Sequence, residues 1–270
     1  MLKDLFSKRG DSAGPARAPA GPGQSRSYSV GWLLQKDKTS IIWDAPRIIR
    51  SDAPKNTVAR SVAQCPSVLD FDRRYFVINS PIDVHMRLAI TDGNLSVTNE
   101  LGDKSPIRPN ALQQMIVFQP QQEWRHPNRP VLQMLTSYHF LSDDPVYINQ
   151  YPPFLHYEAN ARPGVQICGR FPIDVWPRAL MWAFEWHDMS KDLVLKRGEP
   201  LFYVHFEGPD PSASVRMVEA KRTPEVESYL DSITGVTEYV SQTYSLFKTA
   251  RERRPARLLF PKNEPAPDDG

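Results

Sequence analysis

Three histidines are the first candidates for chemistry in this sequence. His139 lies in the segment SYHFLSDD, His156 lies in PPFLHYE, and His205 lies in an alternating apolar run. Histidines on neighbouring strands of a β-barrel, together with a carboxylate, can bind iron or manganese, as in cupin-like enzymes. The H-x-H and H-x-E-x5-H spacings of such sites are absent from the sequence. We therefore predict no cofactor and keep an iron or manganese site at these histidines as the alternative.

Other catalytic motifs are missing as well. The sequence has no G-x-S-x-G nucleophile elbow, no Walker loop, no G-x-G-x-x-G and no H-E-x-x-H. Its two cysteines, Cys65 and Cys168, allow at most one disulfide and fit buried thiols in a reducing compartment. We lean toward a protein without enzymatic activity and leave the question open.

Aromatic residues are concentrated between residues 176 and 206. In the run ALMWAFEWH, strand alternation places Trp182 and Trp186 on one face. Such a face can form a core layer, stack sugars or bases, or anchor a protein interface. Arg178 is within reach of Asp174 and Glu185 as ion-pair partners. The candidate binding residues of this stretch are Trp176, Arg178, Trp182, Trp186 and Tyr203.

The elements that must position these residues are short β-strands. Proline is twice as frequent as glycine, with 26 residues against 13, and proline suits turns and edge strands. The pattern predicts a mainly β domain over residues 28–222, built as one sandwich or barrel of the jelly-roll, cupin-like or dUTPase-like kind. The expected strands are 30–34, 40–43, 75–78, 82–90, 95–98, 114–119, 132–140, 146–150, 165–171, 179–187, 193–195 and 201–207.

Both ends of the chain differ from this β body. Residues 1–27 are rich in Gly, Ala, Pro and Ser, so we expect a flexible N-terminal arm that either has no role or docks onto a partner. Residues 223–257 carry apolar side chains near a 3.6-residue period, which predicts one amphipathic helix or two with a break at Gly235. Residues 258–270 form a polar tail.

Composition excludes several classes of function. The net charge of +2 gives no general reason to bind nucleic acid, and basic residues are sparse within the aromatic strands. The N-terminus lacks the apolar core of a signal peptide, and no apolar window is long enough to span a membrane. We therefore expect no nucleic-acid partner, no membrane and no secretion through a signal peptide.

Three segments carry a family resemblance: CPSVLDFDRRYFVINSPIDV at 65–84, SYHFLSDDPVYINQYPPFLHY at 137–157, and residues 171–208. They resemble a family of proteins from tailed-phage and marine viral genomes, which implies a viral setting and no particular chemistry. The segment LVLKRGEPLFYVHFEG also resembles the strand after a glycine turn in dUTPase-like barrels. The phosphate-contacting serine and the uracil-hairpin glycine motifs of dUTPases are absent, so no catalytic residue is carried over.

These observations lead to one expected function and two alternatives. The first is a non-enzymatic viral protein with a structural, assembly or interaction role, located in the host cytoplasm or the virion. Its partners would be other protein chains, either virion components or further copies of itself. The alternatives are a metal-dependent cupin-like oxygenase or dUTPase-like nucleotide-binding enzyme, and a binder of a small cyclic nucleotide.

Overall fold

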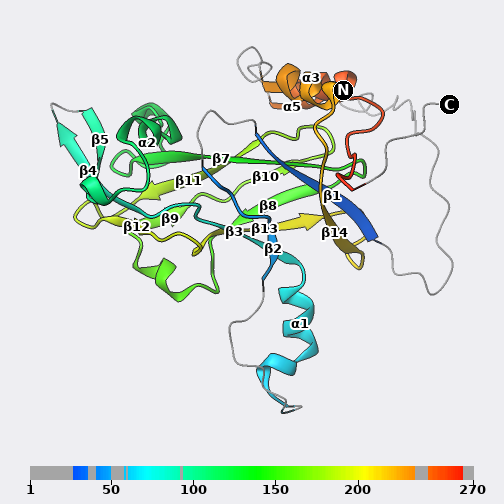
Figure 1. Cartoon of the computed structure of the whole chain (residues 1–270), viewed down its shortest axis with the longest axis horizontal. Coiled ribbons are helices and arrows are strands. Elements are labelled where there is room, and N and C mark those ends of the chain that lie inside the picture. The colour runs from blue at the N-terminus through cyan, green and yellow to red at the C-terminus, as the bar shows by residue number, and fades with distance from the viewer. Residues whose placement is uncertain are drawn as a thin grey trace, which may run out of the picture.

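Strand β7 (Val131–Leu141) is the longest strand among the described residues and organises the largest sheet. This computed structural model describes residues 27–35, 41–49, 58, 60–91, 94–234 and 243–263. Within these ranges the chain is mainly β, with three sheets and several short helices, which confirms the predicted class (Figure 1). None of the described helices is long and apolar enough to cross a membrane.

The six-stranded sheet has the order β14-β1-β7-β11-β9, and β6 also pairs with β7. Its pairs are antiparallel except for β1 and β14, which run parallel. Strands β9 and β11 lie very close together at Gly164. A Cβ at this position would lie 2.0 Å from the carbonyl oxygen of Glu185 on β11. The strands besides β7 are β1 (Ser27–Leu34), β6 (Ile116–Phe118), β9 (Gly164–Gln166), β11 (Ala179–Trp186) and β14 (Ser214–Glu219).

The five-stranded sheet has the order β10-β8-β13-β3-β2, and all its pairs are antiparallel. Its central strand, β13, buries Phe202, Val204 and Phe206 in the main core, as expected for alternate residues of a strand that faces a core. The strands are β2 (Arg47–Ile48), β3 (Tyr75–Asn79), β8 (Tyr147–Tyr151), β10 (Arg170–Pro172) and β13 (Pro200–Glu207).

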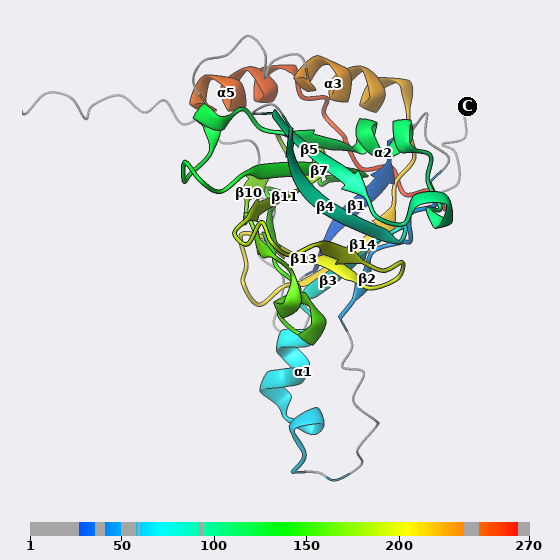
Figure 2. The same ribbon diagram turned by 90° about the vertical axis from the view of Figure 1, so that its left-hand side faces the viewer.

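A three-stranded sheet of order β12-β4-β5 lies at one end of the molecule (Figures 1 and 2). Alternation along β4 buries Val84, Met86 and Leu88 on one face, as the sequence predicts, whereas Ile90 is exposed. The strands are β4 (Val84–Thr91), β5 (Asn94–Asn99) and β12 (Leu193–Leu195). The helices are α1 (Pro66–Asp72), α2 (Pro109–Met115), α3 (Pro224–Thr234) and α5 (Thr243–Arg253), with 3-10 helices η1 (Val62–Gln64), η2 (Gly102–Lys104), η3 (Gln121–Glu123) and η4 (Tyr157–Ala161).

The main core joins all three sheets. Phe140 of β7 contacts Phe206 of β13 with ring centroids 5.3 Å apart, and Phe206 in turn contacts Phe76 of β3. Trp182 of β11 and Met86 of β4 belong to the same buried cluster. Residues of the six-stranded and five-stranded sheets therefore share one hydrophobic interior.

A second, smaller core lies between the six-stranded sheet and the helices α3 and α5, which both views show on the opposite side from α1 (Figures 1 and 2). The hydroxyl of Tyr229 on α3 lies within hydrogen-bond distance of the carbonyl oxygens of Val175 and Ala250, which share its single proton, and so links α3 to both the segment before β11 and α5. Leu258 and Leu259 are also buried here, and the Asp143 carboxylate accepts hydrogen bonds from both of their backbone amides. The first residues of the predicted tail are thus part of a core.

Several local expectations have different outcomes. The first two residues of the expected strand 114–119 belong to α2, and the strand itself is β6. Of the expected strand 40–43, residues 41–43 are not in a strand and residue 40 lies outside the described ranges. The expected strand 165–171 is divided into β9 and β10. Residues 1–26, 235–242 and 264–270 also lie outside the described ranges, so the arm, the middle of the predicted helix and the end of the tail stay predictions.

Candidate functional site

The predicted binding tryptophans lie in the two cores. Trp182 and Trp186 have no exposed surface, and both contact Phe184, with ring centroids 4.9 and 5.9 Å away. Trp176 packs between Phe171 and Phe247 in the second core. These three side chains form core layers, and Tyr203 is the member of the predicted set that borders a cavity.

Arg178 stacks on the Trp176 ring, with the guanidinium carbon 4.8 Å from the ring centroid. It was expected to reach Asp174 or Glu185. The buried Glu185 carboxylate is instead paired with Arg125 at 3.1 Å and His187 at 2.8 Å. Burial lowers the pKa of Arg178. The Arg178 guanidinium is therefore a partly buried cation that lies over the Trp176 ring.

The three candidate metal ligands are not brought together. His139 on β7 faces α3, where burial and the nearby Arg222 lower its pKa to about 4. His205 lies on the far side of the five-stranded sheet, and burial lowers its pKa as well. His156 lies in the loop after β8. Across the described ranges, no group of three His, Cys, Asp or Glu side chains is placed to hold a metal ion. These histidines therefore do not form the iron or manganese site considered as the alternative.

The outer face of the five-stranded sheet is the most distinctive surface of the described chain. Along β13, Phe202, Val204 and Phe206 enter the main core, so Tyr203 and His205 point to the opposite face. Cross-strand neighbours extend this face: Tyr203 lies opposite Val77 and Tyr151, and His205 lies opposite Tyr75 and Asn149. The face is thus aromatic at its centre.

Two further aromatic rings cover part of this face. Phe154, from the loop after β8, contacts Tyr75 and Tyr203, with centroids 5.4 and 5.0 Å apart. Phe71 of α1 contacts Tyr75 at 4.6 Å and Phe154 at 5.8 Å. Phe71 and Phe154 are 41% and 45% exposed, which is unusual for phenylalanine. Phe71 and Phe154 are the exposed members of this cluster, whereas Tyr203, which contacts Phe154, is 3% exposed. We call the cluster the aromatic surface; it consists of Phe71, Tyr75, Tyr151, Phe154, Tyr203 and His205.

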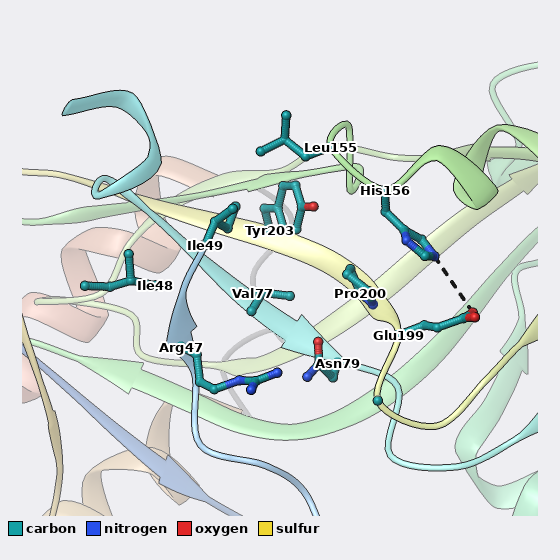
Figure 3. Close-up of a pocket in the computed structure, with 11 residues that line it drawn as sticks. Arg47, Ile48, Ile49, Val77, Asn79, Leu155, His156, Glu199, Pro200 and Tyr203 are labelled. Carbon is teal, nitrogen blue, oxygen red and sulfur yellow. Dashed lines mark ion pairs between the residues drawn. The ribbon is translucent and has the colours of Figure 1, made fainter. Parts of the chain in front are cut away.

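A cavity of about 970 Å³ adjoins the aromatic surface at Tyr203 (Figure 3). Its walls come from β2, β3, the loop after β8 and the turn before β13, and they combine aliphatic groups with a guanidinium, an amide, an imidazole and a carboxylate. Figure 3 shows His156 and Glu199 pointing toward one another; their Nε2 and Oε2 atoms are 3.8 Å apart. The lining residues are Arg47, Ile48, Ile49, Val77, Asn79, Leu155, His156, Gly198, Glu199, Pro200 and Tyr203.

Local backbone geometry sets the rim of this cavity. Gly198 has φ 83°, a left-handed conformation that glycine adopts easily, and it turns the chain from β12 into β13. The Ser80 carbonyl oxygen accepts a hydrogen bond from the Gly198 amide at 2.9 Å, and the Ser80 amide donates to the Glu199 carbonyl oxygen at 2.8 Å. The turn KRGEP therefore delivers Glu199 and Pro200 to the cavity in a defined position.

Arg162 anchors the loop that carries Phe154 and His156. Its guanidinium donates to the carbonyl oxygens of Pro200 at 2.8 Å and Leu201 at 3.2 Å. Burial lowers its pKa to about 10, which still leaves the group charged at neutral pH. The loop after β8 and the start of β13 are thus held together beside the cavity.

This arrangement is suited to binding. The residues described around the cavity include no serine, threonine, cysteine or lysine that would act as a nucleophile. They present apolar walls with a few convergent polar groups, as ligand and peptide sites do. Tyr203 was among the predicted binding residues, whereas Phe71 and Phe154 were not. Phe71 lies in the seven-residue helix α1 and Phe154 lies in a loop, so neither belongs to a segment long enough to show a period; the proline pair before Phe154 was the one local signal. Comparisons with models of protein families, with curated proteins and with solved structures found no match.

Proposed function

We propose that the protein is a non-enzymatic binding protein of a virus that takes part in assembly, and that it holds a segment of another protein chain on the aromatic surface and in the adjoining cavity. The viral setting rests on the resemblance of residues 65–84, 137–157 and 171–208 described above. In this proposal the chain acts in the host cytoplasm or in the particle.

The observation that carries this proposal is the exposure of large apolar side chains around one cavity. Phe71, Phe154 and Leu155 are 41%, 45% and 54% exposed and lie on or beside the aromatic surface. Contiguous exposed apolar groups with polar neighbours are typical of protein interaction sites. Aromatic residues that already contact one another lose little conformational freedom on binding, which makes them effective anchors.

The polar groups of the cavity limit the partner's chemistry. Arg47 supplies a cation at one wall, and Glu199 and His156 supply a carboxylate and an imidazole at another. A partner segment would place an apolar or aromatic side chain against Phe154 and Tyr203. Its backbone or polar side chains would pair with Asn79, Arg47 and Glu199.

The arrangement of the two larger sheets is consistent with an interface on the outer face of the five-stranded sheet. We propose that the five-stranded and six-stranded sheets form the two layers of a sandwich, because Phe140 and Phe206 meet between them in one core. In a sandwich the outer face of one layer is free to serve as an interface.

Site-directed photocrosslinking tests the proposal directly. A photoreactive amino acid at Leu155, and a matched one at Val165 on β9, would be introduced into the full chain in cells that produce the virus. Val165 is 46% exposed and lies in the other sheet. We expect a discrete crosslink to one particle protein from position 155, none from position 165, and a loss of at least tenfold in the Phe154→Ala background. Equal crosslinking from both positions, or none from position 155, would contradict the proposal.

A second candidate is nucleotide binding in the cavity. It is favoured by one observation: the segment that resembles a dUTPase-like barrel forms the rim through Gly198, Glu199 and Pro200. A nucleotide at 100 times its dissociation constant would stabilise the fold by about 2.7 kcal/mol. Thermal unfolding with a nucleotide panel, repeated on Glu199→Gln, measures this. A melting temperature that stays constant across the panel would remove the candidate.

A further inference from the structure

A second groove, separate from the aromatic surface, lies between the β4–β5 hairpin and the segment that precedes β7. It has a volume of about 680 Å³ and an apolar floor. We call it the proline groove. Its apolar walls are Ile90, Leu95, Phe118, Pro120, Trp124, Pro127, Pro130 and Met189, and its polar edge consists of Gln119, Gln121 and Asn128.

The groove is held open by internal hydrogen bonds. The indole nitrogen of Trp124 donates to the Gln119 carbonyl oxygen at 2.8 Å, and the Gln121 amide donates to the Pro127 carbonyl oxygen at 3.1 Å. These bonds fix the Trp124 ring and the loop that carries it. Ile90 and Met189 are nevertheless 56% and 41% exposed, so apolar surface remains open along the rim.

Aromatic and proline rings with amide groups at one edge suit a particular kind of peptide. A polyproline II helix has three residues per turn and leaves its backbone carbonyl oxygens free of internal hydrogen bonds. Its prolines pack into aromatic-lined grooves, and nearby side-chain amides can donate to those carbonyl oxygens. The groove therefore has the chemistry of a polyproline II site.

The chain itself contains a matching segment. Residues 15–22 read PARAPAGP, in which Pro19 and Pro22 are three positions apart and would share one face of a polyproline II helix. Arg17 precedes them. Glu123 is exposed between the groove residues Gln121 and Trp124 and offers a carboxylate of opposite charge. We propose that the proline groove binds residues 15–22 of a second copy of this chain.

The register of the sheet shows why the occupant must come from a second copy. Phe118 in the groove pairs with Leu132 near the start of β7, whereas Gly31 of β1 pairs with Leu141 at its end. Because β1 is antiparallel to β7, Ser27 lies four residues beyond that point, so it is about 40 Å from the groove. Pro22 precedes Ser27 by five residues, which span at most about 18 Å. The segment cannot reach the groove of its own chain.

Such a contact joins two different surfaces, since the arm of one copy enters the groove of the next. If two copies exchange their arms reciprocally they form a closed dimer, and if each copy donates its arm to the next they form a ring or an open filament. The proposal is independent of the aromatic surface, and it adds self-association through the N-terminal arm to the binding of another protein.

Two measurements test the arm exchange. First, a fluorescein-labelled peptide of residues 13–25 is titrated with the full chain, and its anisotropy is recorded. We expect saturable binding that weakens at least tenfold with Met189→Lys, with Trp124→Ala, and with a peptide in which Pro19 and Pro22 are alanine. The matched control is Val194→Lys, an equally exposed apolar residue (46%) outside the groove, which should bind like the parent chain.

Second, sedimentation velocity compares the full chain with its Pro19→Ala/Pro22→Ala variant over a range of concentrations. The parent chain should associate as concentration rises, and the variant should stay a monomer. Met189 is exposed, so its substitution leaves the fold intact even if Trp124→Ala does not. Failure of the peptide to bind, binding that Met189→Lys leaves unchanged, or association that persists in the double proline variant would overturn the proposal. None of these results depends on the crosslink at Leu155.

Discussion

His139 should make the stability of this protein depend on pH in a defined way. Its side chain is 7% exposed on β7 beneath α3, and burial together with the Arg222 guanidinium lowers its pKa from 6.5 to about 4. In the unfolded chain the imidazole takes up a proton near pH 6.5, whereas in the folded chain it stays neutral until about pH 4. Acid therefore favours the unfolded chain.

The size of the effect follows from the two pKa values. The unfolded chain binds one more proton than the folded chain between pH 6.5 and about 4, so the free energy of unfolding falls as pH decreases through this window. At about 1.4 kcal/mol per pH unit, the loss attributable to His139 is about 3 kcal/mol. The contribution is fully present above pH 6.5 and is lost below about pH 4.

Urea denaturation followed by tryptophan fluorescence, at half-unit steps from pH 7.5 to 4.5, provides the measurement. The parent chain is compared with His139→Gln, in which no proton is taken up at this position. The unfolding free energy of the parent chain minus that of His139→Gln should decrease by about 2–3 kcal/mol between pH 7.5 and pH 4.5, whatever its value at pH 7.5. Leu33→Ala is the control: Leu33 is buried opposite His139 on β1 and carries no proton. The reasoning would be refuted if the His139→Gln difference stayed as constant with pH as the Leu33→Ala difference.

Three further substitutions test the packing. Trp182→Ala removes a fully buried ring from the main core and should lower the unfolding free energy by about 3–5 kcal/mol in urea denaturation; a loss below 1 kcal/mol would place the ring outside the core. Leu258→Ala should cost about 2–5 kcal/mol in the same assay, because Leu258 is fully buried beside α3 and α5, whereas a residue in a solvated tail would cost almost nothing. Gly164→Ala should separate β9 from β11, because the added Cβ would meet the Glu185 carbonyl oxygen at 2.0 Å; hydrogen exchange should then accelerate at the amides that join the two strands, and unchanged protection there would contradict this contact.

The strand pattern was predictable because alternation is a local property. Val84, Met86 and Leu88 alternate with polar residues in the sequence and are buried in the structure, and the run 193–195 is a strand with the expected bounds. Helix α3 begins at Pro224, close to the predicted start of the helical period at residue 223, and the Thr223 hydroxyl accepts a hydrogen bond from the Val226 amide as an N-cap does. Helices α1 and α2 were missed because each is only seven residues long and has too few turns to show a period.

The candidate site was only partly predictable. The predicted set combined Tyr203 and Arg178 with three core tryptophans, because composition cannot tell which face of an aromatic strand enters the core. Phe154 lies in an irregular loop, and its contacts with Tyr75 and Tyr203 join residues about 50 to 80 positions apart in the chain. No short-range pattern encodes such a contact.

By itself, the sequence determined that this is a mainly β protein with aromatic strands, a composition rich in Gly, Ala, Pro and Ser over residues 1–27, and apolar residues near a helical period over residues 223–257. These properties follow from side-chain period and composition, which act over a few neighbouring residues. The tertiary structure decided which aromatic residues are core and which are surface: Trp182 and Trp186 are enclosed because the sheets meet over them, whereas Phe71 and Phe154 stay exposed beside a cavity. It also separated the three histidines, since His139 and His205 lie in two different sheets and His156 lies in the loop after β8.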